Sequence, residues 1–204
     1  MESKRTAYPR FYFVSTQDLL DILSNGNAPA KVMVHMTKII AAVDTLDLLE
    51  EGVRPFAKGI QSAVGKESFL FKNECKLIGK VENYMQLILD EMRASLKQIS
   101  LESQKKITEL DKETWIRQDP AMVTLLINNC SWVINCENAF AKYPSDKDSV
   151  KKCYEHQVND LKGLIMMVQG DLDKPLRTKV MCLITMDAHS RDIIDKLVQL
   201  GVTR

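Results

Sequence analysis

The residues closest to a known chemical motif run from Gly59 to Ser68 and read G-I-Q-S-A-V-G-K-E-S. A phosphate-binding loop needs G-x-x-x-x-G-K-[ST], in which backbone amides surround the phosphates and the final hydroxyl holds magnesium. Here five residues separate the two glycines, and Glu67 stands in place of the hydroxyl. A carboxylate at that position would repel a nucleotide. We therefore predict a hairpin turn at Gly65-Lys66 and no nucleotide site.

Asp187, His189 and Ser190 have the residue types of a hydrolytic triad. A triad requires the base to touch the nucleophile, but residues this close together on one helix point in different directions. His189 and Arg191 are therefore expected to be surface or interhelix polar groups. An enzyme remains a competing interpretation, and it would require Lys66 or His189 to lie in a polar pocket.

Metal and disulfide sites have little support in the sequence. The three histidines, His35, His156 and His189, are far apart and form no H-x-x-x-H or H-E-x-x-H pattern. The cysteine count is odd, the spacings are wide and no C-x-x-C pair occurs, so we expect buried, reduced thiols. These cysteines are Cys75, Cys130, Cys136, Cys153 and Cys182. We predict no catalytic, cofactor-binding or metal-binding residue and no cofactor.

The composition is that of a globular protein of 204 residues, with 45% hydrophobic and 27% charged residues. Lys and Arg total 28 and Asp and Glu total 27, which gives a net charge of +1. This balance offers no basis for nucleic acid or an acidic membrane surface as a partner. No apolar run reaches the roughly 18 residues that a membrane-spanning helix needs.

The first 80 residues are expected to form two short helices and a β-hairpin. Ser15 is a predicted N-cap, because Asp18 stands three residues later in the pattern of a capping box. A second helix would begin at Pro29 and continue to Val43. The short apolar runs 60–64 and 67–71 flank Gly65-Lys66 and predict a hairpin near residues 60–71. The aromatic run from Arg10 to Val14 is expected to be extended and buried on both faces.

Residues 81–204 are predicted to form a helical bundle, because apolar residues recur there at spacings of three and four. The fold class is thus mainly α, as antiparallel helical bundles with one small hairpin. The expected apolar faces are Val81, Met85, Ile88, Met92, Leu96 and Ile99, then Val123, Ile127, Cys130 and Ile134, then Val150, Tyr154, Leu161, Leu164, Ile165 and Val168, and last Val180, Leu183, Ile184, Ile194, Leu197 and Val198.

One block of sequence is more specific than these patterns. The run Arg10 to Ser15, R-F-Y-F-V-S, is followed by D-L-L-D-I-L from Asp18 to Leu23. It closely resembles the R-F-Y-F-[VL]-S-x-x-[DE]-L-L-[DE]-I-L block in the linker of dynein heavy chains. Near the other end, the run Thr185 to Asp192 resembles T-x-D-x-H-x-R-D, a form associated with ciliary (axonemal) rather than cytoplasmic dyneins.

The features between these blocks agree in order with the same family. Gly65-Lys66-Glu67 falls where the family has a hairpin turn, and the run from Val81 to Leu96 resembles its V-E-x-W-L … E-M-x-x-[ST]-L helix. Two departures, Tyr84 in place of Trp and Met122 in place of Gln, indicate a divergent member.

The resemblance implies a mechanical role without a catalytic one. The chain would be the C-terminal part of the linker that precedes the first AAA+ module. It would couple ATP turnover in the ring to the power stroke of a microtubule motor. Its expected partners are the AAA+ ring of the same heavy chain and, through the parent complex, microtubules and other dynein chains. The expected location is the cytoplasmic cytoskeleton, in the axoneme of a cilium or flagellum. The alternative is a free-standing helical scaffold for protein interactions.

Overall fold

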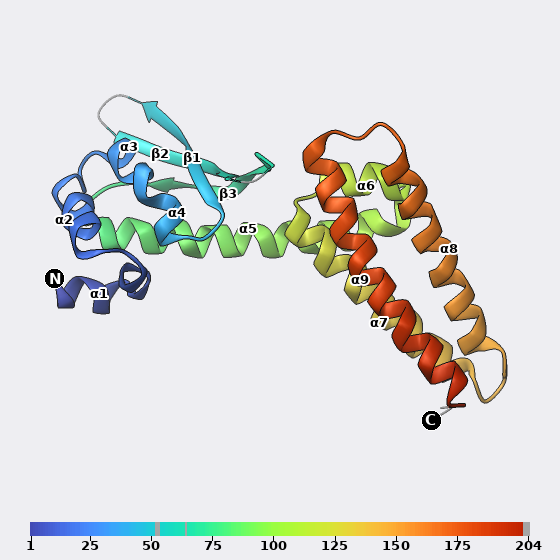
Figure 1. Cartoon of the computed structure of the whole chain (residues 1–204). Helices are drawn as coiled ribbons and strands as arrows, with labels where there is room; N and C mark the ends of the chain where they lie inside the picture. The colour runs from blue at the N-terminus through green and yellow to red at the C-terminus, as the bar shows by residue number, and fades with distance from the viewer. Residues whose placement is uncertain (52–53, 64, 202–204) are drawn as a thin grey trace. The chain divides into compact units, whose positions relative to one another are not determined.

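The computed structural model describes residues 1–51, 54–63 and 65–201. The chain is mainly helical and has one three-stranded antiparallel sheet, which confirms the predicted fold class (Figure 1). It folds into two compact units, Met1–Ile99 (unit 1) and Ser100–Arg204 (unit 2). The sequence suggests a division after residue 80, whereas the compact units divide inside a long helix, α5 (Val81–Glu109).

Unit 1 begins with short helical segments. In order they are α1 (Glu2–Ala7), the 3₁₀ helix η1 (Pro9–Phe13), α2 (Thr16–Ser24), α3 (Pro29–Val32), the 3₁₀ helix η2 (Met33–His35) and α4 (Met36–Ile39). The prediction of an extended aromatic segment is wrong. Proline at the first position of η1 sets a helical φ, and the turn that follows buries Phe11 while Tyr12 and Phe13 are exposed.

The helix predicted from Pro29 to Val43 is also broken and shorter than expected. It contains the η2 turn and ends at Ile39, and Ala42 then adopts a positive φ of 68° before the first strand begins. That left-handed residue turns the chain out of the helix. Val43 therefore opens a strand instead of closing a helix.

The sheet consists of β1 (Val43–Glu51), β2 (Arg54–Ser62) and β3 (Ser68–Lys76) in the order β1-β2-β3. The predicted hairpin corresponds to β2 and β3; Val64, part of its first predicted strand, lies outside the described residues. The sequence did not predict β1. A Cβ on Gly59 in β2 would lie 2.5 Å from the Phe69 carbonyl oxygen, so this close approach of β2 to β3 requires glycine.

The first part of α5 packs on unit 1 and completes its core. Pairing between β2 and β3 is interrupted after the Gly59–Leu70 pair and resumes at Ala57–Cys75, so β3 carries extra residues there. Two amides in this bulge donate to side chains of α5: Lys72 N–H to Ser95 Oγ at 2.8 Å and Asn73 N–H to Glu91 Oε1 at 2.8 Å. The apolar core of unit 1 includes Tyr8, Phe11, Leu19, Ile22, Met36, Ile39, Ala57, Tyr84, Met85 and Ile88.

Unit 2 contains the end of α5 and the helices α6 (Lys112–Gln118), α7 (Ala121–Lys142), α8 (Ser149–Gln169) and α9 (Lys174–Gln199). Short connections make α8 antiparallel to both α7 and α9, which lie beside it in Figure 1. Within the faces predicted for α8 and α9, Val150, Leu161, Leu164, Val180, Leu183 and Ile194 are buried, whereas Ile165 is 41% exposed.

The predicted face of α7 is partly wrong. Val123 and Ile127 are buried as expected, but Cys130 and Ile134 are exposed. Polar and small residues take the buried positions instead, among them Thr124, Asn128, Cys136 and Ala139. Hydropathy alone assigned the wrong residues to this face because several inward-facing side chains are polar. In the part of the chain that the structure describes, no helix has both the length and the apolar character needed to cross a membrane.

Candidate functional site

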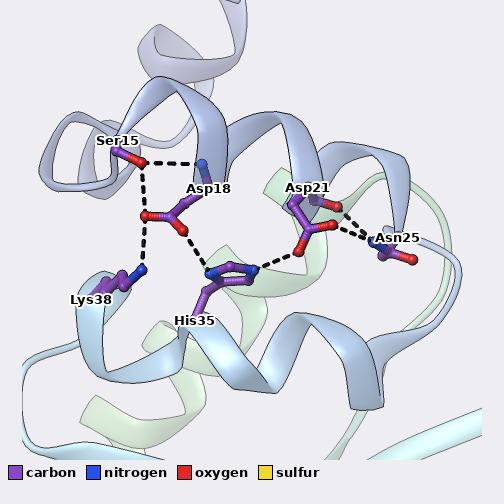
Figure 2. Close-up of polar contacts among 6 residues, drawn as sticks. All are labelled: Ser15, Asp18, Asp21, Asn25, His35 and Lys38. Carbon is purple, nitrogen blue, oxygen red and sulfur yellow. Dashed lines mark hydrogen bonds and ion pairs between the residues drawn. The ribbon is translucent and has the colours of Figure 1, made fainter.

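A polar network joins α2 to the η2–α4 segment at the start of the chain (Figure 2). His35 lies between two carboxylates, with Nε2 2.8 Å from Asp21 Oδ2 and Nδ1 3.5 Å from Asp18 Oδ1. Lys38 Nζ donates to Asp18 Oδ2 at 2.8 Å. Hydrogen bonds from Lys38 and then from Ser15 lower the pKa of Asp18.

The network contains the residue types of a catalytic triad but not its geometry. The Ser15 hydroxyl donates to Asp18 Oδ2 at 2.7 Å and accepts from the Asp18 amide at 3.1 Å. These are the bonds of a helix N-cap, so the predicted capping role of Ser15 is confirmed. Since the serine contacts the aspartate and not His35, no base is placed to activate it. The arrangement ties two short helices together.

The two residues that an enzyme would have required in a polar pocket lie elsewhere. Lys66 is exposed in the β2–β3 turn, and its Nζ contacts Asp44 Oδ2 at 2.6 Å. His189 is exposed on α9, while Asp187 and Ser190 are buried. The structure does not bring these three α9 residues together as a triad.

Unit 2 has an open groove of about 410 Å³ between α7 and α8, and Lys112 and Asp187 also line it. Most of the residues that line it are polar, and they carry both signs of charge. The lining includes Asn128, Trp132, Asn135, Lys142, Asp146, Lys152, Cys153, His156, Gln157 and Asp160.

Asp187 is the most deeply placed carboxylate in this groove. Asn128 Nδ2 donates to its Oδ1 at 2.6 Å, and Lys112 Nζ lies 3.8 Å from its Oδ2. Burial raises the pKa of Asp187, and the charge of Lys112 and the bond from Asn128 offset only part of this rise. The carboxylate thus links α7 and α9 and has one cation nearby.

Further hydrogen bonds join segments of unit 2, in addition to the bond between Asn128 and Asp187. The buried Lys179 Nζ on α9 donates to the carbonyls of Ile116 at 3.1 Å and Asp119 at 2.8 Å. In the amide orientation that gives both Gln157 side-chain atoms hydrogen-bond partners, the Gln157 oxygen accepts from Trp132 Nε1 at 2.8 Å. Each of these bonds joins segments far apart in the sequence.

The cysteines are only partly where the sequence placed them. Cys75 and Cys136 are buried, Cys153 is half-buried, and Cys130 and Cys182 are exposed, all as free thiols. Among residues 1–51, 54–63 and 65–201, no cluster of three or more His, Cys, Asp or Glu side chains is suited to hold a metal ion.

Sequence reasoning missed the buried polar residues of unit 2. A signal for them existed in α9, where Val180, Leu183, Asp187, Ser190 and Ile194 follow one another at spacings of three and four. Asp187 and Ser190 therefore stand on the apolar stripe itself. A polar residue in such a stripe predicts a partner on a neighbouring helix, although spacing does not identify that partner.

Residues 1–103 match the protein family described as "Dynein heavy chain, N-terminal region 2". The chain is 42% identical over 199 residues to the "Dynein alpha chain, flagellar outer arm" of Chlamydomonas reinhardtii, a match that covers 95% of this chain. It is 34% identical over 201 residues to human "Dynein axonemal heavy chain 17" and 33% identical over 202 residues to the "Dynein beta chain, ciliary" of Tripneustes gratilla. Each of the latter two matches covers 97% of this chain.

These matches run through both compact units, although the chain spans only 4% of the length of each of these relatives. All three relatives carry names of the axonemal, flagellar or ciliary kind. The predicted resemblance, to axonemal rather than cytoplasmic heavy chains, is therefore confirmed.

Proposed function

The chain belongs to the dynein heavy chain family, and we propose that it is a mechanical linker segment of an axonemal dynein motor. In this role it transmits the effect of ATP turnover in an AAA+ ring to the power stroke and carries out no chemistry itself. The observation that carries the proposal is the family match over residues 1–103, together with alignment to axonemal heavy chains over 95% or more of the chain.

The construction of unit 2 suits such a role. A segment that transmits force must resist sliding of its helices, and apolar contacts alone have little directionality. Here directional bonds fix the helices along their axes: Asn128 to Asp187 between α7 and α9, and Ser149 Oγ to the Ala139 carbonyl between α7 and α8. Dense packing and buried directional bonds together favour motion of the segment as a rigid body.

The partners follow from the family and belong to the same proposal. The AAA+ ring of the same heavy chain is the direct partner, because a lever changes position only if its contacts differ between nucleotide states. Microtubules and the other dynein chains are partners of the parent complex. The location proposed is the axoneme of a cilium or flagellum.

The experiment uses a complete axonemal heavy-chain motor that carries this segment. Asn128→Ala removes the bond to Asp187 and leaves that carboxylate without its amide donor in a buried site. We expect the motor to hydrolyse ATP at its usual rate while the velocity of microtubule gliding falls several-fold. Asn129→Ala is the matched control, because the adjacent side chain is exposed and should change neither quantity.

Two results would contradict the proposal. One is a parallel loss of ATP hydrolysis and gliding in the Asn128 variant, since this would place the segment in the catalytic cycle. The other is calorimetric binding of ATP to the isolated 204-residue chain, which would mean that the segment has a nucleotide site of its own.

A further inference from the structure

Two cysteines from neighbouring helices of unit 2 lie side by side. The Ser149 hydroxyl on α8 donates to the Ala139 carbonyl on α7 at 2.7 Å, which fixes the register of this antiparallel pair. One turn further along each helix, away from the α7–α8 connection, stand Cys136 and Cys153. This register places the Cys136 and Cys153 side chains next to each other, and a hydrogen bond between the two sulfurs accounts for the opposite shifts of their pKa values.

The two thiols differ in their access to solvent. Cys153 is half-buried and lines the open groove between α7 and α8, beside Lys152 and His156. Cys136 is only 8% exposed and does not line the groove. A small solute in the groove could therefore reach Cys153 but not Cys136.

The hydrogen bond between them makes the accessible sulfur the more acidic one. Donation from Cys136 lowers the pKa of Cys153 to about 7, despite the opposing effect of burial. The same bond, and burial after it, raise the pKa of Cys136. Because the thiolate is the nucleophile, Cys153 is the reactive member near neutral pH, while Cys136 holds its proton.

We propose that Cys153 is an oxidation site for small hydroperoxides and that Cys136 is its resolving cysteine. The Cys153 thiolate attacks one oxygen of the peroxide, the O–O bond breaks, and Cys153 becomes a sulfenic acid while the other oxygen leaves as hydroxide, which takes a proton from solvent to become water. The Cys136 sulfur then attacks the Cys153 sulfur, its proton leaves with the hydroxyl as a second water, and an S–S bond forms. Two thiols are oxidised by two electrons and one hydrogen peroxide is reduced to two waters.

The product is a covalent link between α7 and α8. It would replace a hydrogen-bonded contact with a bond that prevents the two helices from separating near their shared turn. This chemistry does not depend on the mechanical role proposed above, so either proposal can fail without the other.

The test uses the full 204-residue chain with Cys130→Ser and Cys182→Ser, two exposed positions. The first change is needed because Cys130 and Cys136 share one tryptic peptide, residues 118–142, whereas Cys153 lies in residues 153–162. After treatment with hydrogen peroxide at pH 7, mass spectrometry should find these two peptides joined by a reducible bond. The thermal midpoint of unit 2 should rise by about 5–10 °C, and a reductant should reverse the rise.

Two variants at position 136 separate the roles of the resolving thiol. Cys136→Ser keeps a hydrogen-bond donor but has no sulfur, so Cys153 should stop at the sulfenic acid, which dimedone would trap. Cys136→Ala removes the donor, so oxidation of Cys153 should become slower and its pH profile should move to higher pH.

Cys75 is the internal reference, because burial raises its pKa to about 11. At pH 7, iodoacetamide should modify Cys153 on the order of 100-fold faster than Cys75. Equal rates for the two cysteines would overturn the proposal. So would peroxide treatment that leaves both Cys136 and Cys153 reduced, or that oxidises Cys153 without any link to Cys136.

Discussion

The two compact units of this chain differ in the interactions that stabilise each of them internally. Unit 1 has a continuous apolar core between a sheet, short helices and the first part of α5, and its described buried polar side chains are His35, Glu82 and Ser95. Unit 2 buries a larger polar set, made up of Ser103, Asp119, Thr124, Asn128, Ser149, Gln157, Lys179, Asp187 and Ser190.

This difference has a physical consequence for each unit. Apolar burial dominates unit 1, and the directional bonds at His35 and at the β3 bulge add to it. The buried polar groups of unit 2 cost free energy unless they are paired, so they select one register of the helices. We therefore expect substitutions to act on overall stability in unit 1 and on both register and stability in unit 2.

The largest expected effect is the loss of an aromatic side chain from the core of unit 1. Phe11 is fully buried, and its ring packs edge-on against Tyr8 with centroids 4.9 Å apart. Phe11→Ala should destabilise unit 1 by about 3–5 kcal/mol. Hydrogen exchange followed by mass spectrometry should show faster exchange in residues 1–99 and little change in α7–α9.

The control for this prediction lies two residues away. Phe13 is 77% exposed, so Phe13→Ala should change stability by less than about 0.5 kcal/mol. Equal effects of the two substitutions would show that the Phe11 ring is not part of a packed core.

A smaller effect is expected from the buried lysine of unit 2. Lys179→Met keeps most of the apolar stem but removes the ammonium that donates to the Ile116 and Asp119 carbonyls. We expect a loss of about 1–3 kcal/mol, because buried acceptors lose their donor. Chemical denaturation together with hydrogen exchange of residues 112–119 would measure it.

Lys196→Met on the same helix is the matched control, because Lys196 is exposed. A Lys179 variant as stable as the Lys196 variant would mean that methionine packing compensates fully for the lost bonds. In that case the contrast between the two units would not extend to this site.

The smallest effects concern pH, and the two units should respond with opposite signs. In unit 1, burial would raise the pKa of Glu82, but the Lys4 hydrogen bond and the charge of Lys80 lower it overall. A lowered pKa contributes stability that is present above the ordinary value of 4.5 and is lost as pH falls through the folded-state value. Glu82→Gln should reduce this loss of stability in acid.

Asp187 in unit 2 has the opposite linkage, because burial raises its pKa above the ordinary 3.8. Keeping Asp187 ionised in its buried site lowers the free energy of unfolding at neutral pH, and this loss disappears as pH falls through the folded-state pKa. Asp187→Asn should remove this gain of stability on acidification. Unfolding free energies measured from pH 7 down to about pH 2 for both variants check the signs, because the Glu82 contribution is lost only below its ordinary pKa of 4.5. The same sign for both would contradict the contrast.

Local features of the chain could be predicted from sequence, and features that depend on distant partners could not. The Ser15 cap depends on a residue three positions away, and the stripe through Val180, Leu183 and Ile194 depends on helical periodicity alone. By contrast, Lys179 contacts a carbonyl 63 positions earlier in the chain. No spacing rule identifies such a partner.

The failures within unit 1 have equally specific causes. The aromatic run was predicted to be extended because its residue types favour strands, but Pro9 imposes a helical turn on it. The strand β1 was missed because its start depends on the left-handed turn at Ala42, a conformation that alanine rarely adopts. The Cys136–Cys153 pair was missed because the two positions meet only after α7 and α8 have folded back on each other.

The bulge in β3 has a consequence for the order in which the chain can fold during synthesis. The amides of Lys72 and Asn73 are bonded by Ser95 and Glu91, which the ribosome adds about 20 residues later. Synthesis proceeds at roughly 5–20 residues per second, so for about a second or more the outer edge of the sheet has open donors. Over that interval the strand is a site where a second nascent chain could pair, and the arrival of α5 closes it.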